Sequence, residues 1–479
     1  MAGNNGMATS QRLISPREVS SEAVLVVVAA VLAFGLIGIP AGVNPVAVIG
    51  GAAAAVFVAL ILSDVTVGLL CFGLVAFFED LPGVSGTVSA AKLAGVLVAL
   101  TWLATLAIRP AVRRGFVVTH PTLSFAAVLF VAWTVISLAW AKQPSVGITA
   151  ISRYGLNLLL LPIVYAAIRN RRHAHWLVGI LVAGATLSAL YGMVLARGSA
   201  LAEGTSRLSG AGQDANYLAS LLVSGIVLAV ALVSIRSLSP RIRVLALVAV
   251  LVMLVGLIDT VSRSGMVGLG AALVAGIVFA GRGRRFVFVA ISAAIALSVV
   301  AYYVSVASPA ARARITTVQG GSGRTDIWAV GWRMVKAHPI TGIGVGNFPD
   351  TTIDYLLQPG SLDSSLFIVD KPQVAHNIYL ETLAETGVIG LVLFFGIVAF
   401  LMRCALKAAR IFAQAGDRPM DIISRAMVVA TVGVLATDFF ISDQYSKSLW
   451  LQLALGPALL AVAKREAAAR PGAGSTRTS

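Results

Sequence analysis

The amino-acid sequence predicts an all-α, polytopic membrane protein. Of its 479 residues, 58% are hydrophobic and only 12% are charged, and the mean hydropathy is +0.91. Soluble proteins carry about 25% charged residues. The apolar residues also form runs of roughly the 20 residues that a helix needs to cross a bilayer. The length therefore indicates one bundle of about 12–14 transmembrane helices rather than several soluble domains.

Fourteen apolar runs make up the predicted bundle. They lie at residues 22–39, 43–62, 64–79, 88–108, 121–140, 148–168, 174–196, 215–235, 242–260, 264–281, 285–307, 377–403, 420–441 and 446–463. No convincing small-residue cleavage site follows the first run, so we expect a retained span rather than a cleaved signal peptide. Only Ser63 and Asp64 separate the second and third runs, and the third is short. Twelve to fourteen true spans are consistent with these limits.

The placement of the basic residues predicts the orientation. The net charge is +16, and basic clusters follow the fourth, sixth, eighth, tenth and twelfth runs. The clusters are Arg109, Arg113 and Arg114; Arg169, Arg171 and Arg172; Arg236, Arg241 and Arg243; Arg282, Arg284 and Arg285; and Arg403, Lys407, Arg410 and Arg418. A basic cluster on every second loop follows the positive-inside rule, which predicts that both termini and these loops are cytoplasmic. The positive charge is thus a topology signal, and we expect no nucleic-acid partner.

This orientation divides the chain into five parts. We expect a cytoplasmic tail at 1–21, a first membrane bundle at 22–307, an extracytoplasmic loop at 308–375, C-terminal membrane helices at 376–463 and a disordered cytoplasmic tail at 464–479. A loop as long as the third part is usually functional or disordered. Within it, Thr325 can cap a helix that continues to about Lys336. Trp328 and Trp332 share one face of that helix, so we expect it to lie at the outer interface.

Four arginines on the predicted outer side oppose the topology signal and need another explanation. They are Arg153, Arg207, Arg263 and Arg324. Each also has a purely structural interpretation. Arg153 and Arg263 could extend to the interface from a helix end. Arg324 could be an ordinary loop charge, and Arg207 could form a surface ion pair with Glu203 or Asp214.

The same face carries His376, at the start of the twelfth run. Histidine titrates close enough to neutral pH to take a proton from a hydroxyl group. Arginine binds phosphate in bidentate geometry, and fixed cations stabilise the charge left on a departing diphosphate. Outer arginines with one outer histidine therefore suit glycosyl transfer from a lipid diphosphate. His376 could instead only cap a helix. Glu381 and Glu385 share one helix face, and they could assist the chemistry or pair with an arginine.

Two further patterns indicate structure rather than chemistry. Gly342, Gly344 and Gly346 resemble a dinucleotide-binding loop only superficially, because no strand–helix–strand unit surrounds them. We expect a tight turn there that bends the backbone over the bundle. Cys71 and Cys404 lie far apart in the sequence and form neither a disulfide framework nor a zinc-binding spacing. No metal site is predicted.

Three of the polar segments resemble the O-antigen ligase/polymerase superfamily. They are Thr260–Gly265, the segment from Gly323–Trp328 to Phe348, and His376-Asn377 followed by Gly387 and Gly390. The resemblance covers roughly residues 200–400. It implies a glycosyltransferase of the bacterial inner (plasma) membrane that uses no metal or other cofactor and inverts the anomeric configuration. The donor would be a polyprenyl-diphosphate-linked glycan, bound by Arg263 and Arg324, and His376 would activate the acceptor hydroxyl. Roles for Arg153 and Arg207 in substrate binding rest on topology. Fourteen apolar runs exceed the twelve spans usual for such ligases.

Several functions are consistent with the sequence. A ligase passes the glycan to a lipid core or another final acceptor, whereas a polymerase passes it to a second lipid-linked repeat. A polyprenyl-linked glycan flippase or transporter would also have many helices, but such proteins often show internal repeats with polar residues at the midplane. Here the polar residues gather at one face. A scaffold for envelope assembly would need neither the arginines nor the histidine.

Overall fold

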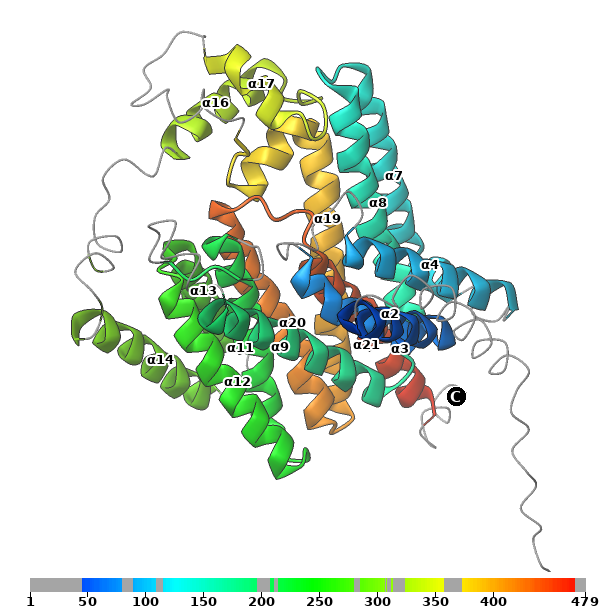
Figure 1. The fold of residues 1–479 in the computed structure, drawn as a ribbon, viewed down its shortest axis with the longest axis vertical. Coiled ribbons are helices and arrows are strands. Elements are labelled where there is room, and N and C mark those ends of the chain that lie inside the picture. Colours follow the sequence, from blue (N-terminus) through cyan, green and yellow to red (C-terminus); the bar gives the residue numbers. More distant parts are fainter. Residues whose placement is uncertain are drawn as a thin grey trace, which may run out of the picture.

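The described part of the chain is a bundle of α-helices (Figure 1). The structure is a computed structural model, and it describes residues 45–79, 89–108, 115–195, 207–210, 214–279, 285–305, 307, 312, 324–356 and 373–469. No β-strand occurs within these ranges. The helices are α2 (Pro45–Ser63), α3 (Val65–Val75), α4 (Ala90–Ile108), α6 (Gly115–Thr119), α7 (Pro121–Ile136), α8 (Pro144–Ala167), α9 (Arg171–Val194), α11 (Ala215–Ser234), α12 (Pro240–Asp259), α13 (Arg263–Phe279), α14 (Arg285–Ser305), α16 (Arg324–Ala337), α17 (Phe348–Leu356), α19 (Ile378–Gln414), α20 (Arg418–Thr437) and α21 (Lys447–Ala468). The all-α membrane bundle predicted from the sequence is confirmed.

Eight helices of the described residues are long and apolar enough to cross a membrane, and further apolar helices are shorter. Thirteen of the predicted runs coincide with a helix, and the first run lies outside the described residues. Two predicted ends were wrong. The run predicted to end at residue 463 belongs to α21, which continues to Ala468, so the first residues of the tail predicted to be disordered are helical. The run predicted to end at residue 403 belongs to α19, which continues to Gln414. The extension stays helical because Ala405, Ala408 and Phe412 repeat at helical spacing and are buried.

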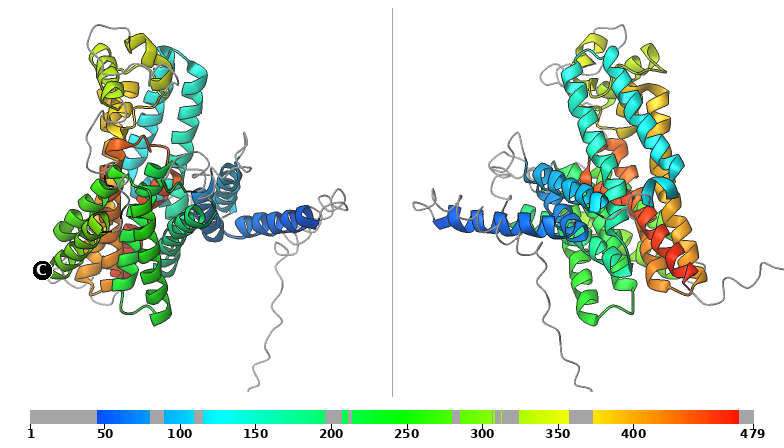
Figure 2. Two further views of the ribbon diagram at one scale, coloured as in Figure 1. Left: turned by 60° about the vertical axis from the view of Figure 1, so that its left-hand side comes forward. Right: turned by 90° about the vertical axis from the view of Figure 1, so that its right-hand side faces the viewer.

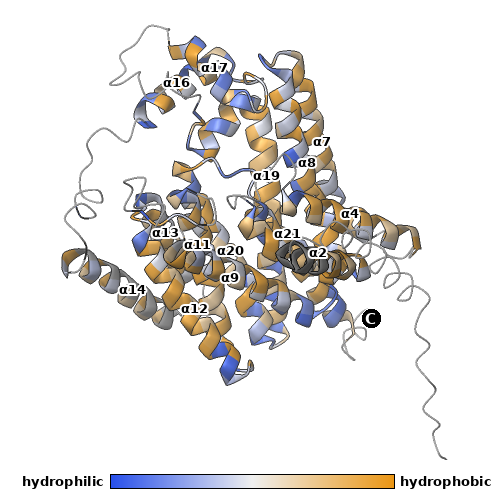
Figure 3. Cartoon of the chain, viewed as in Figure 1, coloured by the Kyte–Doolittle hydropathy of each residue, from blue (hydrophilic) through white to orange (hydrophobic). Residues whose placement is uncertain are grey.

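One end of the bundle is rich in charged side chains, and we call it the basic end. Arg171, the first residue of α9, pairs with Asp417 at 3.1 Å and with Glu466 at 2.6 Å. Because Asp417 precedes α20 and Glu466 lies near the end of α21, these ion pairs tie three helix ends together. Figure 3 shows hydrophilic residues at these helix ends and hydrophobic ones along the helix flanks.

Helices α16 and α17 lie at the opposite end, as all the views of the ribbon show (Figures 1 and 2). We call them, with the connection 338–347, the cover. Their apolar residues form a small core of their own with the segment that begins α19; its members include Ile327, Val330, Met334, Phe348, Leu380 and Ala384. The short helix predicted in this loop is confirmed. It begins at Arg324, so Thr325 lies inside the helix and is not its cap. Trp328 is half-buried, whereas Trp332 is 52% exposed.

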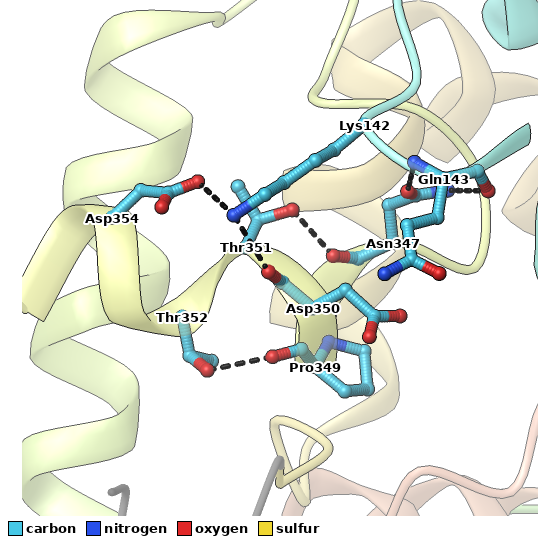
Figure 4. Close-up of polar contacts among 8 residues, drawn as sticks. All are labelled: Lys142, Gln143, Asn347, Pro349, Asp350, Thr351, Thr352 and Asp354. Atoms are coloured by element: carbon cyan, nitrogen blue, oxygen red, sulfur yellow. Dashed lines mark hydrogen bonds and ion pairs between the residues drawn. The ribbon is translucent and has the colours of Figure 1, made fainter.

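Polar contacts attach the cover to the turn between α7 and α8 (Figure 4). The Lys142 ammonium group lies 2.6 Å from the Asp354 carboxylate, and both side chains are exposed. An exposed ion pair of this kind contributes little to stability. The buried Asn347 contributes more, because its Oδ1 accepts the Gln143 N–H at 2.6 Å and its Nδ2 donates to the Gln143 carbonyl at 3.3 Å.

The cover is also inserted into a break in α19. At Gly387 the backbone leaves the helical conformation, with φ 65° and ψ −173°. Such a break leaves helix carbonyl groups without their usual donors. The glycine-rich turn supplies new ones: Ile343 N–H donates to Ala384 at 2.9 Å and Gly344 N–H to Glu385 at 3.0 Å. Gly342, Gly344 and Gly346 all have positive φ, as the predicted tight turn requires.

Candidate active site beneath the cover

His376 lies between the cover and α19 in an unusual conformation. Its φ is +49°, a left-handed value that costs about 1–3 kcal/mol in a residue other than glycine. It does not cap α19. The cap is Asn377, whose side chain accepts the N–H groups of Tyr379 and Leu380, each at 3.0 Å. The strained residue is half-buried, so the surrounding structure must hold it in place.

Glu381 provides that support from the first turn of α19. Its side chain is 3% exposed, and Oε2 accepts the Ala375 N–H at 2.8 Å. The same oxygen accepts the Ser442 hydroxyl group. The Ser442 Oγ in turn accepts the Asn377 N–H at 3.3 Å. The peptide groups on both sides of His376 are therefore tied to one buried carboxyl group, and Gln444 donates to its other oxygen at 2.7 Å.

Helix α16 approaches His376 from the other side. The Trp328 indole N–H donates to the Ala375 carbonyl at 3.0 Å, and the ring packs on Phe439 and Phe440. This contact fixes the start of α16, where Arg324 is the first residue. Burial lowers the pKa of His376, the charge of Arg324 lowers it further, and the charge of Asp214 opposes this shift. The imidazole is therefore neutral, and able to accept a proton, at neutral pH.

A second polar cluster joins the start of α11 to the turn between α12 and α13. Arg207 donates from Nε to the Thr260 carbonyl at 3.0 Å and from Nη2 to Asn216 Oδ1 at 2.9 Å. Ser262 donates to the same Asn216 oxygen at 2.9 Å. These bonds fix a turn in which Val261 has φ +47°. The turn presents Arg263, half-buried, as the first residue of α13.

Asp214 connects the two clusters. It caps α11, and its Oδ1 accepts the Asn216 backbone and side-chain N–H groups at 2.8 and 2.7 Å. Its charge also acts on His376. The structure thus brings His376 and Arg324 together, and it places Arg207 in the cluster that presents Arg263. The fourth arginine of the predicted outer side is placed differently. Arg153 is exposed on α8, with its guanidinium carbon 5.5 Å from the Tyr445 ring centroid.

The connection between α20 and α21, which supports His376, was not among the predicted site segments. Ser442 and Gln444 lie in the short connection between α20 and α21, and both bond to Glu381. Asp214 was considered only as a surface ion-pair partner. A polar run, Ser442-Asp-Gln-Tyr-Ser446, between two apolar runs was the available signal. The half-buried Asp443 in this run has a pKa raised to about 7, chiefly by desolvation.

The fold and this site define a class of protein, a multi-pass membrane protein with a polar cluster at one end of its bundle. The comparisons with known proteins are more specific. A family model described as O-antigen ligase matches residues 248–395, which include Arg263, Arg324, His376 and both helices of the cover. The chain is also 28% identical, over 313 residues, to the O-antigen ligase of Pseudomonas aeruginosa strain PAO1, and the match covers 64% of this chain and 70% of that protein.

Both matches are to O-antigen ligases, and they support the resemblance to the O-antigen ligase superfamily. The resemblance that the sequence motifs indicated is therefore confirmed. The matched region contains the break at Gly387, the cover and His376, which depend on one another in the structure.

Proposed function

We propose that this protein transfers a glycan from a polyprenyl-diphosphate carrier to an acceptor hydroxyl group, at the extracytoplasmic face of the bacterial inner membrane. The observation that carries the proposal is the conformation of His376, a strained and half-buried residue held by Glu381 next to the charge of Arg324. Strain of this kind is concentrated at functional sites. A histidine that only capped a helix would not need a strained backbone.

In the proposed reaction, His376 accepts the proton of the acceptor hydroxyl group. The acceptor oxygen forms a bond to the anomeric carbon of the donor glycan, and the bond from that carbon to the diphosphate oxygen breaks. The electron pair leaves with the polyprenyl diphosphate. Attack opposite the leaving group inverts the configuration at the anomeric carbon. The resemblance to the superfamily adds the expectation that no metal ion takes part.

Arg263 and Arg324 are the proposed diphosphate ligands. Each is the first residue of a helix, α13 and α16 respectively. The positive end of the helix dipole disfavours a cation at this position and favours an anion. Two arginines at helix starts therefore support a role in anion binding better than a structural role. A departing diphosphate would be stabilised by both guanidinium groups and by the helix ends.

The other two arginines have different proposed roles. Arg207 bonds to the backbone of the turn before Arg263 and to Asn216, so we assign it to positioning the diphosphate site. Arg153 lies over Tyr445, in the connection that also holds Ser442. Its exposed position supports contact with the acceptor or the carrier lipid at the edge of the site.

The orientation is part of the proposal. The described basic clusters at 169–172, 236–243 and 403–418 lie at the end opposite the cover, and they support a cytoplasmic location for that end and for both termini. Ligase and polymerase reactions would use the same residues and differ only in the acceptor. A glycan flippase remains the alternative from another class. It would move the donor across the membrane without forming a glycosidic bond.

Arg324→Ala tests the proposed diphosphate site. We expect the transfer rate in a reconstituted assay to fall by about 10²–10³-fold, because the leaving group loses a fixed cation. Lys336→Ala is the matched control, since Lys336 is an exposed cation at the other end of the same helix. Equal rates for the two variants, at equal amounts of folded protein, would exclude this role for Arg324.

Glu381→Gln tests how His376 is held. An amide nitrogen would replace one of the oxygens that accept from Ala375, Ser442 and Gln444. Loss of one or two buried hydrogen bonds costs about 1–3 kcal/mol. We expect kcat to fall by roughly 10–100-fold while KM for the donor changes little, because the diphosphate ligands stay in place. A variant with wild-type kcat would show that Glu381 does not position His376.

The Asp214→Asn variant tests the electrostatics of His376. Asparagine also caps helices well, so α11 should keep its start. Removal of the negative charge makes the imidazolium form less favourable and lowers the His376 pKa further. The rate is lost as pH falls through that pKa, so the acid limb of the pH–kcat/KM profile should move to lower pH. An acid limb at an unchanged or higher pH would contradict the assignment of His376 as the base.

A further inference from the structure

A groove runs along the side of the bundle, separate from the site beneath the cover. It has a volume of about 980 Å³ and is lined by α7 and α8, with contributions from α4, α6 and the end of α21. Its walls are mostly apolar and include Val131, Leu158, Leu161 and Pro162. An apolar groove of this size is large enough for an extended ligand.

The depth of the groove matches one leaflet of a membrane. On α8 its lining extends from Gly155 to Ala166. At 1.5 Å per residue this segment is about 16 Å long, close to half of a hydrocarbon core of about 30 Å. Gly155 lies at the inner limit of the groove, and a Cβ atom built on it would meet no atom within 4 Å. The groove thus begins at the basic end and stops near the middle of the bundle.

Three cations lie at the mouth of the groove, at the basic end. They are Arg169, Lys464 and Arg465, and no carboxylate is among the lining residues that the structure describes. The hydroxyl groups of Thr119 and Tyr165, 3.2 Å apart, also line it. The nearby Glu466 is engaged by Arg171 at 2.6 Å. An apolar channel of one-leaflet depth beneath a cluster of cations is complementary to a lipid with acyl chains and a negative headgroup.

We propose that this groove is a binding site for an anionic phospholipid of the leaflet at the basic end. The acyl chains lie against α7 and α8, and the phosphate group lies between Arg169, Lys464 and Arg465. Charge complementarity selects the anionic headgroup over a zwitterionic one. The cations lie at the opposite end from His376, so a donor whose diphosphate is beneath the cover cannot use them. The proposal is therefore independent of the proposed function.

The test is native mass spectrometry of the full-length protein, titrated with phosphatidylglycerol and with phosphatidylcholine of the same acyl chains. We expect phosphatidylglycerol to bind on the order of tenfold more tightly. The double variant Lys464→Gln/Arg465→Gln removes two exposed cations of the mouth and should lose most of this preference. Arg403→Gln/Arg410→Gln is the matched control, because it removes two exposed cations at the same end that do not line the groove.

A second pair of variants tests the apolar channel. Gly155→Phe places a ring in the open space of the groove and should abolish the tightly bound lipid. Gly179→Phe on α9 also projects into open space but lies outside the groove, and it should bind lipid as the wild type does. Equal affinity of the wild type for the two lipids would overturn the proposal. An equal loss of phosphatidylglycerol binding in each variant and its control would also overturn it. So would displacement of phosphatidylglycerol by an equimolar polyprenyl phosphate, which would assign the groove to an isoprenoid.

Discussion

Replacing His376 with alanine will lower the rate of glycan transfer by about 10²–10⁴-fold, the contribution typical of a positioned general base. No neighbouring group replaces it readily, because Glu381 already accepts hydrogen bonds from Ala375, Ser442 and Gln444. Donor binding should change little, since Arg263 and Arg324 remain. The measurement is a single-turnover transfer assay with a lipid-linked donor, normalised to folded protein.

His338→Ala provides the control for this prediction. His338 is exposed just after α16, and its backbone is bonded within the turn that follows. Its removal should leave the rate within about twofold of the wild type, as is usual for exposed sites away from special features. Similar losses in the two variants would mean that histidine removal disturbs the cover rather than the chemistry. A fully active His376→Ala protein would remove the basis for the proposed mechanism.

The Gly387→Ala variant is expected to fold poorly or not at all. The backbone there, with φ 65° and ψ −173°, is in a region that is essentially restricted to glycine. A Cβ atom would lie 2.0 Å from the Ile340 carbonyl oxygen. Relief of that contact requires the cover to separate from α19, which would break the hydrogen bonds from Ile343 and Gly344. We expect a loss of more than about 4 kcal/mol, which is exceptional for a single substitution.

Gly396→Ala in the same helix is the comparison. A Cβ atom at this position meets no atom within 4 Å, and alanine favours a helix over glycine by about 1 kcal/mol. This variant should be as stable as the wild type or more so. Thermal unfolding in detergent, with the yield of monodisperse protein, checks both predictions. Normal stability of Gly387→Ala would mean that the break in α19 does not need glycine.

Much of the fold could be predicted because membrane helices are specified by local composition. Runs such as 215–235 and 242–260 correspond to α11 and α12 within two residues. The end of α19 could not be predicted in this way. Residues after Arg403 mix cations with small apolar residues, and only packing shows that Ala408 and Phe412 continue a buried face. The break at Gly387 is equally invisible locally, because its replacement hydrogen bonds come from the distant turn at 342–346.

The candidate site was predicted in part. His376, Arg263 and Arg324 could be proposed from residue type and topology, since arginines on the predicted outer side need an explanation other than the topology signal. The residues that hold these three side chains in place could not be predicted. Ser442 is 61 residues from Glu381 and Arg207 is 53 residues from Thr260, so only the folded chain brings these groups together. Glu381 and Glu385, which share one helix face in the sequence, make different contacts in the structure. Glu381 supports His376, whereas Glu385 accepts the Phe348 N–H at 3.3 Å at the start of α17.

The central claim is that this membrane protein forms a glycosidic bond, and product analysis with purified protein tests it most directly. Wild-type protein in liposomes would be supplied with a polyprenyl-diphosphate-linked glycan as donor. The acceptor would be a lipid core in one reaction and a second lipid-linked repeat in another. We predict a new glycosidic bond of inverted configuration, with one polyprenyl diphosphate released per bond formed. Movement of the donor across the bilayer with no covalent product would contradict this account and indicate a transporter.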